Sequence, residues 1–231
     1  MSESGHRRER TIVLDTETTG LDPATGDRVI EVAAIELVNL MPTAQVYHVL
    51  IDPERDIPPE ASKVHGFTID MLRGKPRFAE VAAGLVEFLG DAPIVAHNAP
   101  FDFGFLDNEF RLAGLPPLDR ARMVDSLMLA KQRYPGMPNS LDALCRRLGV
   151  DNSMRDSHNA LLDVKLLAQV YLELMGGRQP GFVLALNMAG PTVVLDGLSK
   201  PRTPRPILPT EAELAAHAAF LGKLKEPLWL Q

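Results

Sequence analysis

The sequence predicts an α/β protein with a mixed five-stranded sheet flanked by helices and a C-terminal tail. Strand-like segments joined by short connections come first, which favours an antiparallel meander. Short apolar strands then alternate with helical segments, which is typical of a sheet with helices on both faces. Beyond residue 177 the chain becomes weakly patterned and then rich in proline, which is typical of a linker.

These changes divide the 231 residues into four expected segments. Length and composition allow one domain with a sizeable core. In order along the chain they are a disordered leader (1–9), a folded domain (10–177), a linker (178–209) and a helical tail (210–231).

The five strands are predicted from runs of apolar and β-branched residues that end at turn residues. The second and third strands are expected to be joined by a turn at Met41 and Pro42. The predicted strands are Thr11–Asp15, Val29–Leu40, Gln45–Ile51, Ala92–Ala96 and Arg122–Val124.

The helices are predicted from apolar spacing and from residues that begin or end a helix. Two prolines open a short helical piece, and Val64–Thr68 (VHGFT) is expected to be a loop between two short helices. Thr210 and Glu213 form a capping-box pattern at the start of the tail helix. The longer predicted helices are Phe78–Leu89, one that ends near Gly114, Ser126–Arg133, Leu141–Leu148, His158–Met175 and Thr210–Leu224.

Composition and charge exclude some functions. No apolar run is long enough to span a bilayer and the charged N-terminus has no apolar core of a signal peptide, so we expect a cytoplasmic protein without a membrane partner. A net charge of −6 argues against coating long nucleic acids, but not against an enzyme that holds a few nucleotides. The single cysteine, Cys145, has no disulfide partner and is expected to pack on its helix.

Two carboxylates lie where the first predicted strand ends. The run Thr11–Leu14 is uninterrupted and stops at Asp15 and Glu17 (DTETTGL). Side chains alternate along a strand, so Asp15 and Glu17 point the same way. Neighbouring like charges at a buried edge are unfavourable unless a cation lies between them, and a divalent metal is suited to this. A solvated strand end is the alternative for this motif alone.

Further candidate metal-binding and catalytic residues lie near the starts of predicted helices. Asp102 lies at a helix start in HNAPFDFGF, and His158 and Asp163 lie in HNALLD. A separation of five residues turns a helix by about 140°, so the last two would border one cleft only if His158 is in the loop or first turn. Four carboxylates with a histidine suit phosphodiester hydrolysis with two divalent metal ions, Mg²⁺ or Mn²⁺, in which His158 takes a proton from the attacking water.

The three motifs, in this order and spacing, resemble those of the DEDDh family of 3′→5′ exonucleases, which have an RNase H-like fold. This resemblance implies that Asp15, Glu17 and Asp163 bind one metal, that Asp15 and Asp102 bind the second, and that His158 is the general base. The expected activity is removal of nucleotides from a single-stranded DNA 3′ end.

Residues 139–153 (NSLDALCRRLGVDNS) resemble one group within this family, the proofreading subunits of bacterial DNA polymerase III. A stand-alone DEDDh nuclease for DNA repair or RNA 3′-end trimming is the rival hypothesis.

Several residues near the motifs are expected to contact the substrate. The resemblance places Val64 and His65 against the terminal base, whereas the residues alone also fit a histidine in a solvent-exposed loop. Thr18 and Leu21 are expected to line the nucleotide site, with an ordinary turn and a buried leucine as the alternative. Asn98 is a candidate for substrate contact, and capping of the following helix is favoured.

Three other polar residues are interpreted as having a structural role or as lying on the protein surface. Asp125 is expected to accept a bond at the start of the following helix, and Asp142 is expected in a first helical turn. His48 is interpreted as a surface residue.

The tail resembles partner-binding segments of the same proofreading subunits. Gln179 to Leu184 (QPGFVL) loosely resembles a segment that binds the sliding clamp, although Pro180 and Gly181 depart from it; an ordinary loop is the alternative. Residues 210–231 resemble the segment that docks on the alpha polymerase subunit, and an apolar helix face behind a proline-rich linker suits a partner-binding tail. A helix that folds back on its own domain is the alternative.

Overall fold

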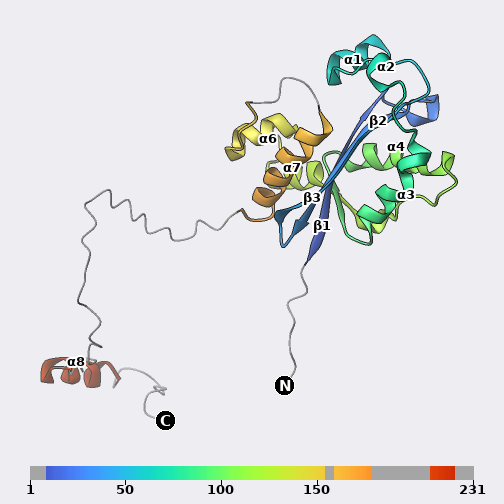
Figure 1. Ribbon diagram of the computed structural model, residues 1–231. Helices are drawn as coiled ribbons and strands as arrows, with labels where there is room; N and C mark the ends of the chain where they lie inside the picture. The colour runs from blue at the N-terminus through green and yellow to red at the C-terminus, as the bar shows by residue number, and fades with distance from the viewer. Residues whose placement is uncertain (1–8, 154–158, 178–208, 222–231) are drawn as a thin grey trace, which may run out of the picture. The chain divides into compact units, whose positions relative to one another are not determined.

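The computed structural model describes residues 9–153, 159–177 and 209–221 (Figure 1). The chain divides into two units, Met1–Phe182 and Val183–Gln231, and each is described by itself. No helix in the described ranges has the length and apolar character needed to cross a membrane.

The first unit contains the predicted mixed sheet of five strands, in the order β3-β2-β1-β4-β5. β2 runs antiparallel to both of its neighbours, β1 and β3, whereas β4 runs parallel to β1 and β5 runs parallel to β4. The strands are β1 (Arg10–Thr18), β2 (Val29–Val38), β3 (Met41–Leu50), β4 (Ile94–Ala96) and β5 (Met123–Asp125).

Helices cover both faces of this sheet, as Figure 1 shows for α3 and α4 on one side and α6 and α7 on the other. The helices of this unit are α1 (Pro59–His65), α2 (Ile69–Leu72), α3 (Phe78–Leu89), α4 (Ala99–Leu112), α5 (Ser126–Arg133), α6 (Leu141–Leu148) and α7 (Ala160–Leu174), with short 3₁₀ turns at Pro23–Thr25 and Arg120–Arg122.

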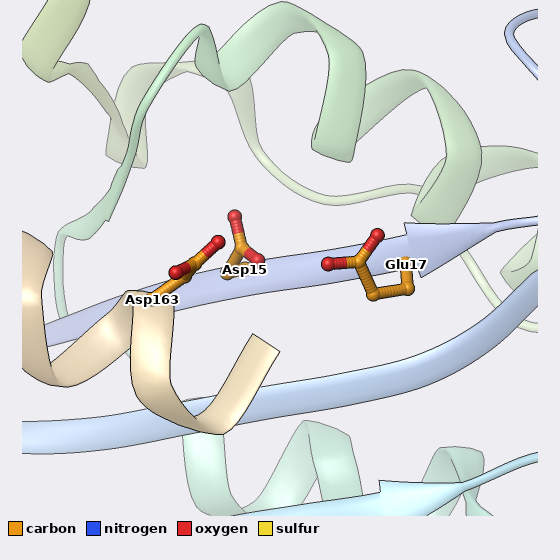
Figure 2. Close-up of side chains that lie close together, drawn as sticks. All are labelled: Asp15, Glu17 and Asp163. Carbon is orange, nitrogen blue, oxygen red and sulfur yellow. The ribbon is translucent and has the colours of Figure 1, made fainter. Parts of the chain in front are cut away.

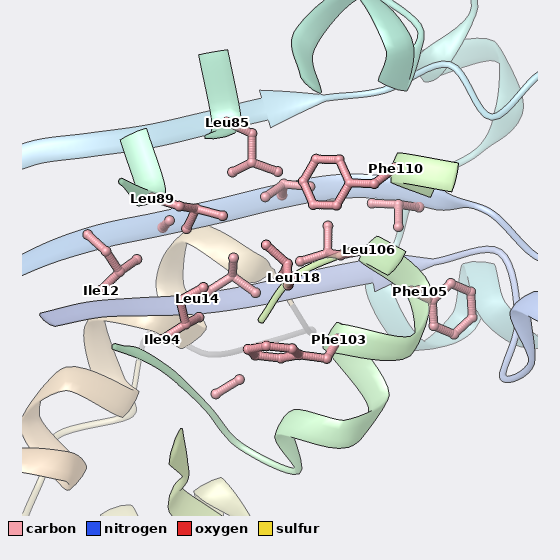
Figure 3. Packing of buried hydrophobic residues seen from close by; sticks show 14 of the residues in the cluster. Ile12, Leu14, Leu85, Leu89, Ile94, Phe103, Phe105, Leu106, Phe110 and Leu118 are labelled. Atoms are coloured by element: carbon pink, nitrogen blue, oxygen red, sulfur yellow. The ribbon is translucent and has the colours of Figure 1, made fainter. Parts of the chain in front are cut away.

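Side chains alternate along β1, so this strand contributes to two hydrophobic cores, one on each face of the sheet. Ile12 and Leu14 face α3 and α4, where they pack with aromatic residues of α4 such as Phe103 and Phe110 (Figure 3). Val13 faces the other way and packs with residues of α6 and α7, among them buried Cys145. The central strand is therefore buried on both faces, which explains its uninterrupted apolar run.

The structure extends the first predicted strand. β1 continues through Asp15 and Glu17 to Thr18, so both carboxylates lie within the strand and not beyond its end. Thr16 ↔ Val32 and Glu17 ↔ Glu31 remain in register with β2, and the register shifts only between Glu17 and Thr18. Ladder hydrogen bonds are made by the backbone, so polar side chains do not end a strand.

The predicted turn between β2 and β3 was wrong. Asn39 and Leu40 form it, with φ of 52° and 66°, a pair of left-handed conformations that matches the twist of a hairpin. Met41 and Pro42 already belong to β3, where a proline is tolerated because β3 is at the edge of the sheet.

Helix predictions fared better, with two exceptions. The bounds of α3, α5 and α6 match the prediction, and Asp142 lies in the first turn of α6. Val64 and His65 form the last turn of α1, not a loop, because the chain leaves the helix at Gly66 with φ 79°. α7 begins at Ala160, with Asn159 as its N-cap.

The second unit contains α8 (Glu211–Leu221) within the described residues. The Thr210 N–H and hydroxyl donate to Glu213 Oε2 at 2.8 and 2.9 Å, and the Glu213 N–H donates back to Thr210 Oγ1 at 3.3 Å. The predicted capping box is therefore present. His217 is exposed, and the predicted end of this helix at Leu224 lies outside the described residues.

Candidate active site

β1 and α7 together bring three carboxylates to one point. Asp15 and Glu17 share the face of β1 that packs against α7, and Asp163 lies in the first turn of α7. One carboxylate oxygen from each residue lies within 4.8 Å of the other two. Figure 2 shows the three side chains pointing toward one another. The structure therefore joins two of the predicted motifs that are far apart in the sequence.

Asp15 is the most perturbed of these groups. Burial raises its pKa well above the usual value, and the negative charges of Asp102, Glu17, Asp163 and Glu31 raise the pKa further, in that order. A carboxylate in this position is costly to ionise without a compensating positive charge. The site therefore favours either a proton or a cation at Asp15.

Asp102 approaches β1 from the opposite side. It lies in the first turn of α4 and is 3% exposed. Its Oδ1 accepts from the Thr16 N–H at 3.1 Å and from the Thr16 hydroxyl at 2.8 Å. Burial raises its pKa to about 7, against a lowering by the bonds from Thr16. Asp102 is outside the three-carboxylate group, but its charge acts on Asp15.

The donor set fits divalent metal ions. Hard cations such as Mg²⁺ and Mn²⁺ prefer oxygen ligands, and clustered carboxylates supply them. The pKa of Asp15 is raised first by burial and then by the neighbouring carboxylates, and a bound cation would offset both effects. The cluster is consistent with divalent metal binding.

A cavity of about 380 Å³ adjoins the carboxylates. Four of the predicted substrate residues, Thr18, Leu21, Val64 and His65, lie in its wall, and Asn98 does not. Its full lining is Thr16, Glu17, Thr18, Thr19, Gly20, Leu21, Asp27, Pro58, Glu60, Ala61, Val64, His65 and Phe101.

The residues of this wall differ in exposure. Leu21 is 85% exposed, so the alternative of a turn with a buried leucine was wrong. His65 is 5% exposed and its Nδ1 accepts from the Phe67 N–H at 3.0 Å, which excludes a solvent-exposed loop histidine. Val64 beside it is about half exposed. The cavity thus combines one fixed imidazole with accessible apolar side chains.

Asn98 occupies the N-cap position of α4 but its side chain makes no capping bond, so the favoured interpretation was wrong. Its φ of 70° is left-handed. Asp125 Oδ1 accepts from the N–H groups of Asn98 and Ala99 at 3.1 and 3.4 Å and from Leu127 N–H at 3.0 Å. The predicted structural role of Asp125 is confirmed, and it serves the starts of two helices.

His48 is exposed, as expected of a surface residue, but it contacts a buried carboxylate. Its Nε2 lies 2.7 Å from Oε1 of Glu31, a residue of β2 that is fully buried. The sequence analysis missed Glu31. The available signal was a single acidic residue inside the apolar run VIEVAAI, since an interior charge requires partners.

Some predicted residues cannot be placed. His158, the segment from Gln179 to Leu184 and residues 222–231 lie outside the described residues. Their predicted roles stay predictions.

Comparison with known sequences gives one family over most of the chain. The sequence profile of the exonuclease family matches residues 12–171. The chain is 43% identical over 225 residues to the DNA polymerase III subunit epsilon of Rickettsia conorii (strain ATCC VR-613 / Malish 7), covering 93% of this chain and 96% of that protein. It is 41% identical over 231 residues to the subunit of the same name from Escherichia coli (strain K12), covering 94% of each.

Solved structures share the fold. Exonuclease X in complex with 5′ overhanging duplex DNA is 25% identical, with a TM-score of 0.57, over 71% of this chain and 90% of the other. The nuclease domain of 3′hExo, a DEDDh family member bound to rAMP, has a TM-score of 0.62 at 18% identity, over 74% and 93% of the two chains. These likenesses confirm the expected exonuclease (RNase H-like) fold.

Proposed function

The chain belongs to the exonuclease family, with epsilon subunits of DNA polymerase III as relatives over nearly its whole length, and we propose from this that its substrate is the single-stranded 3′ end of DNA at a replicating polymerase. It is a 3′→5′ proofreading exonuclease. Its site of action would then be the cytoplasm, together with the polymerase.

The convergence of Asp15, Glu17 and Asp163 beside the cavity carries this proposal. A terminal nucleotide in the cavity would place its phosphodiester near the carboxylates, because Glu17 belongs both to the cavity wall and to the cluster. The scissile bond and the metal-binding oxygens would then share one small region.

Each acidic residue has a proposed role in holding metal. Asp15, Glu17 and Asp163 would hold one divalent ion, and Asp15 with Asp102 would hold the second, Mg²⁺ or Mn²⁺. When bound, two such ions stabilise negative charge on the attacking and leaving oxygens of an in-line displacement. Thr16 keeps the Asp102 carboxylate in a fixed orientation through two hydrogen bonds.

Proton transfer is assigned to His158, which would accept a proton from the attacking water. An imidazole has an unperturbed pKa of about 6.5, which suits a general base near neutral pH. Asn159, the residue after it, is fixed as the N-cap of α7 because its side chain accepts from the Leu162 N–H at 3.1 Å.

The cavity wall would position the terminal nucleotide. Leu21 and Val64 offer accessible apolar surface for a base, and His65 is held by its bond from Phe67. Thr18 is fixed because its hydroxyl donates to the Gly20 carbonyl at 2.6 Å. Asn98 is outside this wall, and we keep it only as a candidate for contact further along the strand.

The tail is proposed to bind other replication proteins. Leu214 and Phe220 of α8 are each more than half exposed, which suits a helix that docks in the groove of a partner. We assign residues 210–231 to the alpha polymerase subunit and Gln179 to Leu184 to the sliding clamp, with 178–209 as the linker and 10–177 as the exonuclease domain.

The test is digestion of a 3′-mismatched primer by the full-length chain, with and without the polymerase subunit and with Mg²⁺ or Mn²⁺. We expect faster removal of a mismatched than of a paired 3′ nucleotide, and loss of digestion in the double variant Asp15→Ala, Glu17→Ala. A folded double variant that still digests DNA would refute the site assignment.

Partner binding needs a separate measurement. We expect the alpha subunit to co-purify with the full chain but not with a chain that lacks residues 178–231. Unchanged binding after this deletion would overturn the proofreading-subunit proposal and favour a stand-alone nuclease for DNA repair or RNA 3′-end trimming.

A further inference from the structure

We propose that Glu31 is a positioning residue for catalysis: it anchors the start of α7 to the sheet, so that Asp163 faces Asp15 and Glu17. The inference concerns a residue outside the three exonuclease motifs. It rests on the proposed function only for the reaction that it serves.

Glu31 lies at the right place in the sheet for this task. It is directly opposite Glu17 in the β1–β2 ladder, so its side chain is on the face of the sheet that carries Asp15 and Glu17. It is fully buried. A buried carboxylate beside other carboxylates is costly, and it persists only where hydrogen-bond donors compensate.

The compensating donors come from two separate elements. Glu31 Oε2 accepts from the Ala160 N–H, the first N–H of α7, at 3.1 Å. Glu31 Oε1 contacts His48 Nε2 of β3 at 2.7 Å and accepts from Asn159 Nδ2 at 3.4 Å. A helix start also favours a negative charge through the helix dipole. The carboxylate thus joins β2, β3 and the start of α7.

These contacts distinguish Glu31 from a metal ligand. Each of its two oxygens already accepts from a donor of the protein, and Glu31 is not among the three residues whose oxygens cluster within 4.8 Å. Its bond to Ala160 instead acts three residues before Asp163 on the same helix. Because a helical turn is rigid, fixing the first N–H fixes the direction of the Asp163 side chain.

The first test is direct Mn²⁺ binding by the full-length chain, measured by calorimetry without DNA. Removing a residue that orients a metal ligand typically costs roughly 10- to 100-fold in metal affinity or activity. We expect Glu31→Ala to weaken Mn²⁺ binding by about this factor. We also expect kcat for 3′-end digestion to fall with little change in KM for DNA, since the cavity wall is untouched.

Glu31→Gln separates the hydrogen bond from the charge. Glutamine keeps a carbonyl oxygen for the Ala160 N–H, so most of the metal affinity and kcat should return. If Glu31→Gln loses as much as Glu31→Ala, the negative charge or direct metal ligation is responsible, and the positioning role is refuted.

Glu36→Gln is the matched control. Glu36 lies on the same strand and accepts from Arg10 Nε at 2.6 Å, but it pairs with Ile12 of β1 in the ladder, away from the site. It should change neither metal affinity nor kcat. Thermal unfolding of each variant, measured in parallel, separates a loss of stability from a loss of positioning.

A folded Glu31→Ala with wild-type Mn²⁺ affinity and kcat overturns the proposal, even if its melting temperature is lower. If Glu31→Ala does not fold, Ala160→Pro replaces it, because proline is tolerated at the first position of a helix and removes the N–H that Glu31 accepts; weaker Mn²⁺ binding supports the proposal and wild-type binding overturns it. A wild-type chain without 3′-end digestion would refute the proposed function instead, while Mn²⁺ binding would still test Glu31.

Discussion

The two helices that carry Asp102 and Asp163 are attached to the sheet in different ways. α4 is attached through side chains: Asp102 bonds to Thr16, and Glu109 accepts from Arg28 Nε and Nη2, both at 2.8 Å. α7 is attached through its backbone, because Glu31 accepts the Ala160 N–H.

This difference shows which interactions place each carboxylate. Asp102 is fixed by hydrogen bonds to its own carboxylate, so it should tolerate small shifts of its helix. Asp163 takes its position from the helix start, so it should depend on the residues that hold that start. The charges of both aspartates raise the pKa of Asp15.

The largest effect is expected at Asp15, which is proposed to bind metal together with Asp102 of α4 and with Asp163 of α7. Asp15→Asn should lower kcat by about 10³-fold. The metal ions would lose a ligand, and the transition state would lose about 4 kcal/mol of charge stabilisation, where each 1.36 kcal/mol corresponds to a tenfold change in rate. The same change should raise the melting temperature of the metal-free protein, since it removes an acid whose ionisation is opposed by burial and by the neighbouring carboxylates. Digestion kinetics and calorimetry check the two expectations, and a loss of both activity and stability would contradict them.

A second prediction concerns Asp102 and the dependence of protein stability on pH. Its pKa rises from 3.8 to about 7 on folding without metal, so the folded chain holds a proton that the unfolded chain has released. The free energy of unfolding should therefore fall by a few kcal/mol as pH rises from about 4 to about 7.

Thermal melts of chelator-treated protein measure this effect. Mn²⁺ should raise the melting temperature more at pH 8 than at pH 6, and Asp102→Asn should flatten the pH dependence. A metal-free melting temperature that is constant over this range would be the opposite result.

The third prediction breaks the attachment of α4 far from Asp102. Glu109 is 1% exposed and bonds to Arg28 and to the Val29 N–H. Glu109→Gln should lower the free energy of unfolding by about 2 kcal/mol, because bonds to a charged group are weakened. The kcat per folded molecule should stay at the wild-type value, since Thr16 still fixes Asp102. Denaturant titration and digestion kinetics test the two parts, and a matching fall in kcat would show that Asp102 depends on its helix.

The smallest effect is expected from the threonine that holds Asp102. Thr16→Val removes the hydroxyl bond to Asp102 but keeps the backbone bond and the shape. We expect kcat to fall about tenfold, equivalent to one lost hydrogen bond to a charged group. Thr16→Ser should restore it, and equal kcat values in all three proteins would show that the backbone bond alone suffices.

Local signals were sufficient to predict most elements, and long-range contacts were not. The bounds of α3, α5 and α6 followed from apolar spacing and capping residues. The turn at Asn39 and Leu40 was missed because a leucine with positive φ has no compositional signal. The contact of Glu31 with Ala160 joins residues 129 positions apart, so no local pattern reveals it.

For the site itself, the motif residues Asp15, Glu17 and Asp163 were selected from the sequence and do converge. Their convergence depended on the pairing of β1 with its neighbours and on the packing of α7, which periodicity alone does not give. The position of His158 relative to Asp163, which the sequence left open, stays open because His158 lies outside the described residues.

The alternation of β1 also limits how the length of this chain can vary. Asp15 and Glu17 face α7 while Thr16 between them bonds to Asp102 on the side of α4. Inserting or deleting one residue between Leu14 and Thr18 would exchange the faces, so that the threonine would meet α7 and the acids would meet the core of α4. Homologous chains should therefore vary in length in the segment after Thr19, where the 3₁₀ turn Pro23–Thr25 lies, and keep a constant length within the strand.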